Sequence, residues 1–184
     1  TIPNFHNTAS RYRDFEQAVK ENASGRADEV REEIAFIRAR AADCSILTDL
    51  LAKGELPLRV THNDTKLNNV MLDDVTGRPV CVIDLDTVMP GLSLYDYGDS
   101  MRFGTNPAAE DETDLSKVTC DLNLFEQYTK GFLEECGSML TPQEIENLPL
   151  SAKLMTLECG MRFLADHIAG DTYFKIHREG HNLD

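Results

Sequence analysis

Hydrophobic residues in the first third of the chain recur every three or four positions, which is typical of amphipathic helices. Tyr12, Phe15 and Val19 form the first run, which starts after a capping Asn7 or Thr8 and stops at Gly25. A longer helical pattern follows, in which Val30, Ile34, Ile37 and Ala41 repeat at helical spacing. We expect Ile46, Leu47, Leu50 and Leu51 to extend the apolar face of this pattern until Gly54.

The pattern changes at Pro57 to short runs of apolar and β-branched residues. Three short strands are expected, over residues 58–60, 70–72 and 80–83. Residues 73–79 between the last two strands are rich in Asp, Gly and Pro, which favour turns. The second and third strands are therefore predicted to form a small β-hairpin.

The rest of the chain again has a helical pattern. Helices are expected over residues 94–103, 122–136 and 150–168, and Thr141 begins a capping sequence for another. The predicted fold class is α+β and mostly helical, with one β-hairpin inserted into a helical domain. Because 184 residues suffice for one domain with a real core, we expect a single domain over residues 1–184.

Composition narrows the class of protein further. Hydrophobic residues make up 41% and charged residues 27%, which is typical of a soluble globular protein. The formal net charge of −14 argues against partners that are nucleic acids or anionic membrane surfaces. The five cysteines form no C-x-x-C pair, so we expect reduced, buried thiols and a cytoplasmic location.

An unusual concentration of polar residues lies in and beside the predicted hairpin. His62 and Asp64 stand two residues apart, and Asn69 follows Asp64 by five positions. Asp84 and Asp86 come directly after the apolar run 80–83, and on a continued strand both carboxylates would face one side. Loops at the ends of a hairpin can bring Asp64, Asn69 and Asp84 together.

Carboxylate and amide oxygens suit a hard cation such as Mg²⁺, which keeps other positions for water or nucleotide phosphates. A carboxylate that does not bind the metal is then free to accept a proton from a substrate hydroxyl. This division of labour, with H-x-D-x-x-x-x-N and a later Asp, is typical of phosphoryl transfer. A role for these residues in merely completing turns is the simpler alternative.

Three segments resemble the aminoglycoside phosphotransferase and choline kinase superfamily. They are its catalytic loop (THNDTKLNNV, 61–70), its metal-binding segment (VIDLDTVMPG, 82–91) and the aspartate motif that follows (YDYGD, 95–99). Residues 3–7 and 170–180 resemble the branch of that superfamily that phosphorylates N-acetylhexosamines. The resemblance implies the C-terminal lobe of a protein-kinase-like fold, with the hairpin carrying the catalytic loop.

The resemblance also implies an activity and its site. It implies ATP-dependent phosphorylation of the anomeric hydroxyl of N-acetylglucosamine or N-acetylgalactosamine, with Mg²⁺ and ATP as cofactors. Asp64 matches the catalytic carboxylate and His62 the structural histidine of the loop. Asn69 and Asp84 match the Mg²⁺ ligands, and Asp86 is an auxiliary carboxylate. Lys66 stands where many relatives have His, and either neutralises phosphate charge or is simply exposed.

Two residues near the end of the chain are candidates for binding the sugar. Arg162 lies in an otherwise apolar helical run, where an arginine is rarely buried without a partner. Its guanidinium either binds sugar oxygens or pairs with an internal carboxylate such as Asp96 or Asp99. Tyr173 follows the break at Gly170, and either presents its hydroxyl or ring to the sugar or packs in the core.

The sequence contains no glycine-rich phosphate loop and no P-loop. In the superfamily those parts belong to an N-terminal nucleotide-binding lobe, which we expect to be absent here, with both chain ends cut. The isolated chain is then expected to be inactive and to dimerise through faces that the other lobe normally covers.

Two other readings stay open. The acceptor of a kinase-like enzyme is not fixed by short motifs, so choline, homoserine or an aminoglycoside is an alternative to the sugar. A non-catalytic binding module of the same fold is the alternative from another class of protein.

Overall fold

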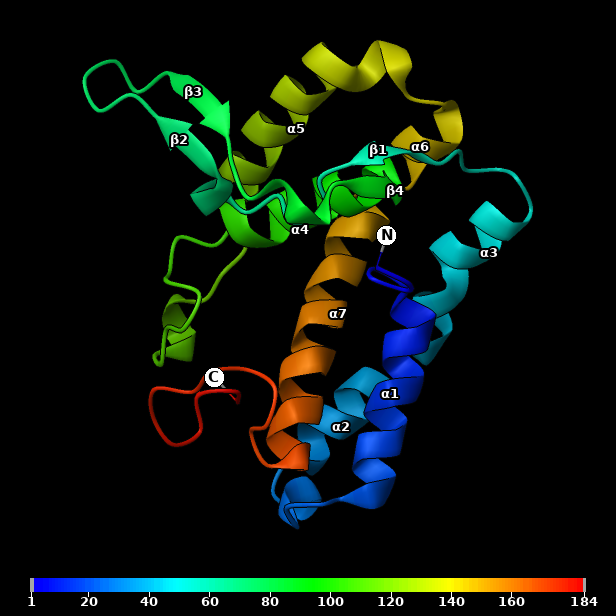
Figure 1. Cartoon of the computed structure of the whole chain (residues 1–184), viewed down its shortest axis with the longest axis vertical. Helices are drawn as coiled ribbons and strands as arrows, with labels where there is room; N and C mark the ends of the chain where they lie inside the picture. The colour runs from blue at the N-terminus through cyan, green and yellow to red at the C-terminus, as the bar shows by residue number, and fades with distance from the viewer. Residues whose placement is uncertain (1, 184) are drawn as a thin grey trace.

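The computed structural model describes residues 2–183 and is mostly helical, as the sequence predicts; it contains two small antiparallel sheets, of which only one was expected. The longest helix, α7 (Leu148–Ala169), has α1 (Thr8–Glu21) at its side over much of its length (Figure 1). Two short strands, β2 (Val70–Leu72) and β3 (Pro79–Val82), project from the end of the molecule that lies opposite the C-terminal end of α7 (Figure 1).

The N-terminal helices form because their caps and apolar spacing agree. Asn7 caps α1 by accepting a hydrogen bond from the backbone N–H of Ser10. The helix ends earlier than predicted, because Asn22 adopts a left-handed conformation before Gly25 is reached. The longer helical pattern expected from Val30 to Gly54 is divided into α2 (Arg31–Arg38) and α3 (Ile46–Ala52), with a 3₁₀ turn at Ala41–Ser45 between them. α1 and α2 pack their apolar faces on α7, in a buried cluster that includes Phe15, Ile34, Ile37, Met161 and Ile168.

The second half of the chain supplies α4 (Ser93–Gly104), α5 (Leu122–Cys136), α6 (Pro142–Glu146) and α7. The capping sequence predicted at Thr141 is confirmed: its hydroxyl accepts from the N–H of Glu144, whose carboxylate accepts from the N–H of Thr141. α4 crosses α7 closely, and a second buried cluster fills this contact, with Leu92, Leu94, Tyr97, Met101, Leu154 and Met155 among its members.

Two antiparallel strand pairs lie around the polar loop. The predicted hairpin is confirmed, with Val70 opposite Val82 in the β2–β3 pair. β1 (Arg59–Thr61) instead pairs with β4 (Met89–Gly91), a strand that the sequence did not suggest because Met-Pro-Gly lacks a strand pattern. The polar loop that follows β1 is therefore held at the junction of the two sheets and α4.

The surface differs in two respects from the expectations. The five cysteines are all free, but only Cys44 is buried, while Cys81 and Cys120 are exposed. Apolar side chains of the hairpin are also exposed, and the dimerisation expected of such a face stays a prediction. No helix within residues 2–183 has the length and apolar character needed to cross a membrane.

Candidate active site

The polar loop over residues 62–69 connects β1 to β2 and ends in a 3₁₀ turn, Leu67–Asn69. Asn63 takes a left-handed conformation (φ 64°), which asparagine tolerates better than most residues. Its side chain is buried: Oδ1 accepts from the Thr61 hydroxyl at 3.0 Å, and Nδ2 donates to the carbonyl of Thr87 at 3.0 Å. Asn63 is thus a turn residue that also anchors the loop.

Two carboxylates of α4 hold the loop by its backbone. Asp96 accepts from the N–H groups of His62, at 2.9 Å, and of Asn63, at 2.7 Å. Asp99 accepts from the N–H of Thr65 at 2.9 Å. Burial raises the pKa of Asp96, and although the two backbone N–H groups oppose this, the pKa stays above its ordinary value. The aspartate motif therefore fixes the path of the loop.

Asp99 has its own cation. Arg102, one turn further along α4, donates through Nε at 3.1 Å and through a terminal nitrogen at 2.9 Å to one oxygen of Asp99. Burial alone would lower the pKa of Arg102, but Cys159, Asp99 and Glu110 hold that pKa above its ordinary value. The pairing of Arg162 with Asp96 or Asp99, one of its two expected roles, is wrong, because other groups occupy both carboxylates.

Asp64 lies where the loop meets solvent, with 28% of its side chain exposed. The amide nitrogen of Asn69 donates to the backbone carbonyl of Asp64 at 2.8 Å and to its Oδ2 at 3.1 Å. Lys66 Nζ lies 3.6 Å from the other carboxylate oxygen, and its side chain is 31% exposed. Asp64 and Asn69 therefore lie together, as expected, and Lys66 lies beside them.

His62 connects this group to Asp84. Its Nδ1 accepts from the N–H of Asp64 at 3.3 Å, so its Nε2 carries the proton and donates to the carbonyl of Ile83 at 3.0 Å. The N–H of Ile83 donates to the carbonyl of Asn69 at 2.9 Å. These bonds place Asp84 at the base of the hairpin, next in sequence to a residue that contacts both His62 and Asn69.

The prediction that Asp84 and Asp86 face one side of a continued strand is wrong. The strand ends at Val82, Asp84 has a left-handed backbone (φ 61°), and Asp86 lies in the 3₁₀ turn Leu85–Thr87. Strand alternation therefore does not apply to this pair, and their placement depends on the turn instead.

The oxygens of this corner suit a hard cation. Asn69 donates through Nδ2, and within residues 2–183 no hydrogen bond uses its Oδ1 or the exposed carboxylates of Asp84 and Asp86. The described residues contain no group of three His, Cys, Asp or Glu side chains able to hold a metal ion. A cation here would take its other ligands from water or a phosphate, as Mg²⁺ does.

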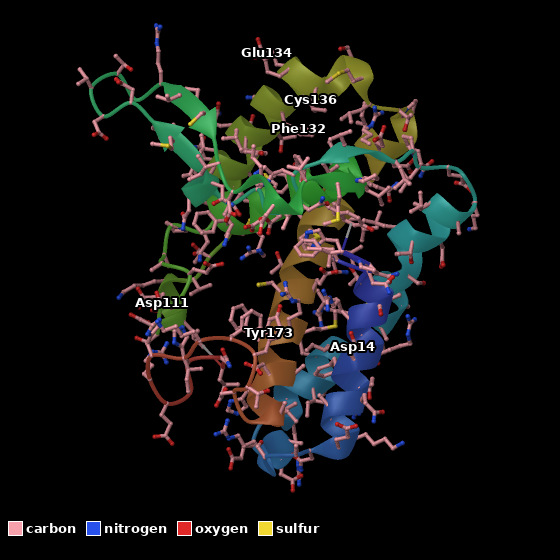
Figure 2. The ribbon with its side chains drawn as sticks, viewed as in Figure 1. Asp14, Asp111, Phe132, Glu134, Cys136 and Tyr173 are labelled. Carbon is pink, nitrogen blue, oxygen red and sulfur yellow. The ribbon has the colours of Figure 1, made fainter. Side chains whose placement is uncertain are left out.

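Arg162 and Tyr173 meet at a single ring. The Arg162 guanidinium carbon lies 5.4 Å from the centre of the Phe174 ring, and the Tyr173 ring stands edge-on to it at 4.9 Å. Tyr173 is 75% exposed and lies beside α7 (Figure 2). In the part of the chain that the structure describes, no hydrogen bond or ion pair joins either residue to the loop 62–69.

The buried carboxylates of α7 were not predicted from the sequence. Glu158 and Asp166 are 1% and 6% exposed, whereas Arg162 is only half-buried. Asp166 accepts from the N–H groups of Thr172, Tyr173 and Phe174, and so fixes the segment that carries Tyr173. Both carboxylates interrupt an apolar helical pattern, which is the signal that could have identified them.

A comparison with family models matches the part of the chain that contains this loop. A model of the phosphotransferase enzyme family APH matches residues 1–119. The matched region includes the loop 62–69, Asp84 and the aspartates of α4, but neither Arg162 nor Tyr173. Because the match covers more than half of the sequence, the chain belongs to the APH phosphotransferase enzyme family.

Proposed function

We propose that this chain carries the catalytic loop of an ATP-dependent kinase that phosphorylates the anomeric hydroxyl of an N-acetylhexosamine, giving the sugar 1-phosphate. One observation carries the proposal. Hydrogen bonds join Asp64 to Asn69, and hydrogen bonds from His62 and Asn69 hold Ile83, the residue before Asp84, against the same loop. One carboxylate with an amide and a second carboxylate beside it is the set that phosphoryl transfer requires.

Each residue of the corner has a role in this proposal. Asp64 orients the acceptor hydroxyl and takes its proton, which its partial exposure permits. Asn69, through its free Oδ1, and Asp84 bind Mg²⁺, with Asp86 as an auxiliary ligand. Bound Mg²⁺ would offset the negative charge of the nucleotide phosphates. Lys66, whose Nζ lies 3.6 Å from Asp64 Oδ1, would neutralise charge on the transferred phosphate.

The neutral sugar is proposed as acceptor from the likeness of residues 3–7 and 170–180 to the N-acetylhexosamine 1-kinase branch. Arg162 and Tyr173 are the proposed sugar contacts. Their meeting at Phe174 supports this, because a guanidinium and an exposed phenol there can donate to sugar oxygens. Choline, homoserine and aminoglycosides are the competing acceptors.

The phosphate-covering loop is proposed to come from a region of the protein outside these 184 residues. The sequence has no glycine-rich phosphate loop, and kinases of this type need one together with a lysine that contacts the phosphates. The isolated chain is accordingly expected to be inactive.

Phosphorus NMR tests the proposal. The chain, together with its nucleotide-binding region, is incubated with Mg-ATP and, in separate samples, N-acetylglucosamine, N-acetylgalactosamine, choline, homoserine and an aminoglycoside. A sugar 1-phosphate signal with the two N-acetylhexosamines alone is the expected result. Phosphorylation of another alcohol would refute the acceptor but keep the kinase. ATP binding with no transfer to any alcohol would favour a binding module instead.

A further inference from the structure

A buried histidine from the N-terminal segment contacts the loop that contains Asp64. His6 precedes α1 and is 57 residues distant from the loop in sequence. Its Nε2 lies 2.8 Å from the carbonyl oxygen of Asn63, and its Nδ1 lies 2.9 Å from Oε1 of Glu158 on α7. The side chains of His6 and Glu158 are 8% and 1% exposed.

The surroundings of the His6 ring require two N–H donors. Both neighbours of the His6 ring are acceptors, a carbonyl oxygen and a carboxylate oxygen. A neutral imidazole has only one N–H and can satisfy only one of them, whereas an imidazolium donates to both. The other oxygen of Glu158 accepts from the Thr8 hydroxyl at 2.7 Å. One extra proton on the His6–Glu158 pair therefore completes the whole buried network.

The hydrogen bond from His6 acts on the peptide group that joins Asn63 to Asp64. Asn63 immediately precedes Asp64, and its N–H is already held by Asp96 at 2.7 Å. The N–H of Asp64 is held by His62, and the carbonyl of Asp64 by Asn69. The carbonyl of Asn63 is the remaining polar group of this stretch, and His6 binds it.

We propose that His6 is a positioning residue of the catalytic loop, which it holds through the carbonyl of Asn63, while Glu158 keeps both nitrogens of its ring protonated. The designation of the loop as catalytic rests on the proposed function; the hydrogen bonds and their dependence on protonation do not. The N-terminal segment and α7 thus join α4 in fixing the backbone that leads into Asp64.

The charges around His6 favour the protonated form. Burial alone would lower the pKa of His6, but the hydrogen bond and charge of Glu158, the Asn63 carbonyl and Asp99 raise that pKa above its ordinary value of 6.5. Asp96, on the same helix as Asp99, also interacts with the ring charge, and the Tyr95 ring packs 5.3 Å away. The bond to Asn63 is therefore present below about pH 6.5 and is lost as the pH rises through the higher pKa of folded His6.

Replacing Glu158 by Gln removes the loss of this hydrogen bond at high pH. The glutamine side chain introduced by Glu158→Gln can donate from its amide nitrogen to Nδ1 and accept from Thr8, so a neutral His6 keeps its proton on Nε2 and still binds Asn63. Protonation of His6 in this variant breaks the bond from the amide. Thr8→Val is the matched control, because it removes a hydrogen bond to Glu158 without touching the ring.

The experiment uses the described chain alone, with hydrogen exchange of the amides of residues 63–65 measured by NMR between about pH 6 and about pH 9. In the wild type and in Thr8→Val, we expect the protection factors of these amides to fall at least about tenfold over this range, which is one hydrogen bond lost. In Glu158→Gln they stay constant or rise with pH. In the wild type, nitrogen shifts of the His6 ring at pH about 6, below the ordinary histidine pKa, should show Nε2 protonated.

Three results overturn the inference: protection that does not fall with pH in the wild type, protection that falls equally in wild type and Glu158→Gln, or an unprotonated Nε2 in the wild type at pH about 6. The ring shifts decide the question even if Glu158→Gln does not fold. None of these readouts requires turnover. Loss of the pH dependence therefore refutes the role of His6 alone, whereas absent phosphoryl transfer with the pH dependence intact refutes the proposed function alone.

Discussion

Helices α4 and α7 approach each other very closely at Gly98, between the two aspartates of α4 that hold the loop. A Cβ atom there would lie 2.5 Å from the backbone carbonyl oxygen of Ser151 on α7 and 2.6 Å from Cγ of Met155. Ordinary van der Waals contact begins at 3.4 Å, so Gly98→Ala requires α4 and α7 to separate by about 0.9 Å. The obstacle is backbone, which cannot rotate away.

Two opposing effects determine the change in the free energy of unfolding that we expect for Gly98→Ala. Overpacking a well-packed contact costs about 1–3 kcal/mol, and more where backbone must move. The higher helix propensity of alanine returns about 1 kcal/mol. Gly160→Ala in the interior of α7 is the matched control, because no atom lies within 4 Å of its added Cβ. That variant should gain about 1 kcal/mol with no penalty.

Urea unfolding followed by far-ultraviolet circular dichroism measures both variants. Gly98→Ala should unfold at least about 1 kcal/mol more easily than Gly160→Ala, which corresponds to roughly 2–4 °C in Tm for a domain of this size. Because Asp96 moves with α4, hydrogen exchange of the His62 and Asn63 amides should also accelerate. If Gly98→Ala were as stable as Gly160→Ala, the close helix contact would not exist in solution.

Two further predictions concern carboxylates that accept several hydrogen bonds. Burial raises the pKa of Glu144, but hydrogen bonds from Arg59, Ser93 and Thr141 outweigh it and hold that pKa at about 2, below the ordinary 4.5. Glu144 therefore stabilises the fold by up to about 3 kcal/mol above about pH 4.5, and this contribution is lost as the pH falls towards 2. In Glu144→Gln, the free energy of unfolding measured in urea should depend less on pH between these values. The same pH dependence in the variant and the wild type would contradict this. Asp96→Asn places an amide N–H against a backbone N–H of the loop, so it should lower the free energy of unfolding by about 1–3 kcal/mol. Hydrogen exchange of the His62 and Asn63 amides should also become faster. Unchanged exchange would show that Asp96 does not hold the loop.

The elements that depend on local information were predictable from the sequence. α5 and the capping box at Thr141 were both predicted, because apolar spacing and capping chemistry act over a few residues. The hairpin was predictable for the same reason, since its turn residues lie between its strands. The grouping of Asp64 with Asn69 likewise follows from five-residue spacing in one loop.

The features that depend on distant contacts were not predictable. β1 pairs with β4 across an entire hairpin, and nothing in Met-Pro-Gly indicates a strand. The left-handed turn at Asp84 ends the strand where alternation suggested that it continued. The bond from His6 to Glu158 spans 152 residues, so a lone histidine before a helix gave no sign of its partner.

The central claim is that Asp64 accepts the proton of the acceptor hydroxyl in the corner formed by Asn69 and Asp84. The most direct test is the kcat and KM of Asp64→Asn in the chain joined to the proposed nucleotide-binding region, with Asn68→Ala, an exposed residue of the same loop, as control. The account predicts a kcat about 10²–10⁴-fold lower for Asp64→Asn, with little change in KM, and near-normal kinetics for Asn68→Ala. An unchanged kcat in Asp64→Asn would remove Asp64 from the reaction and contradict the account.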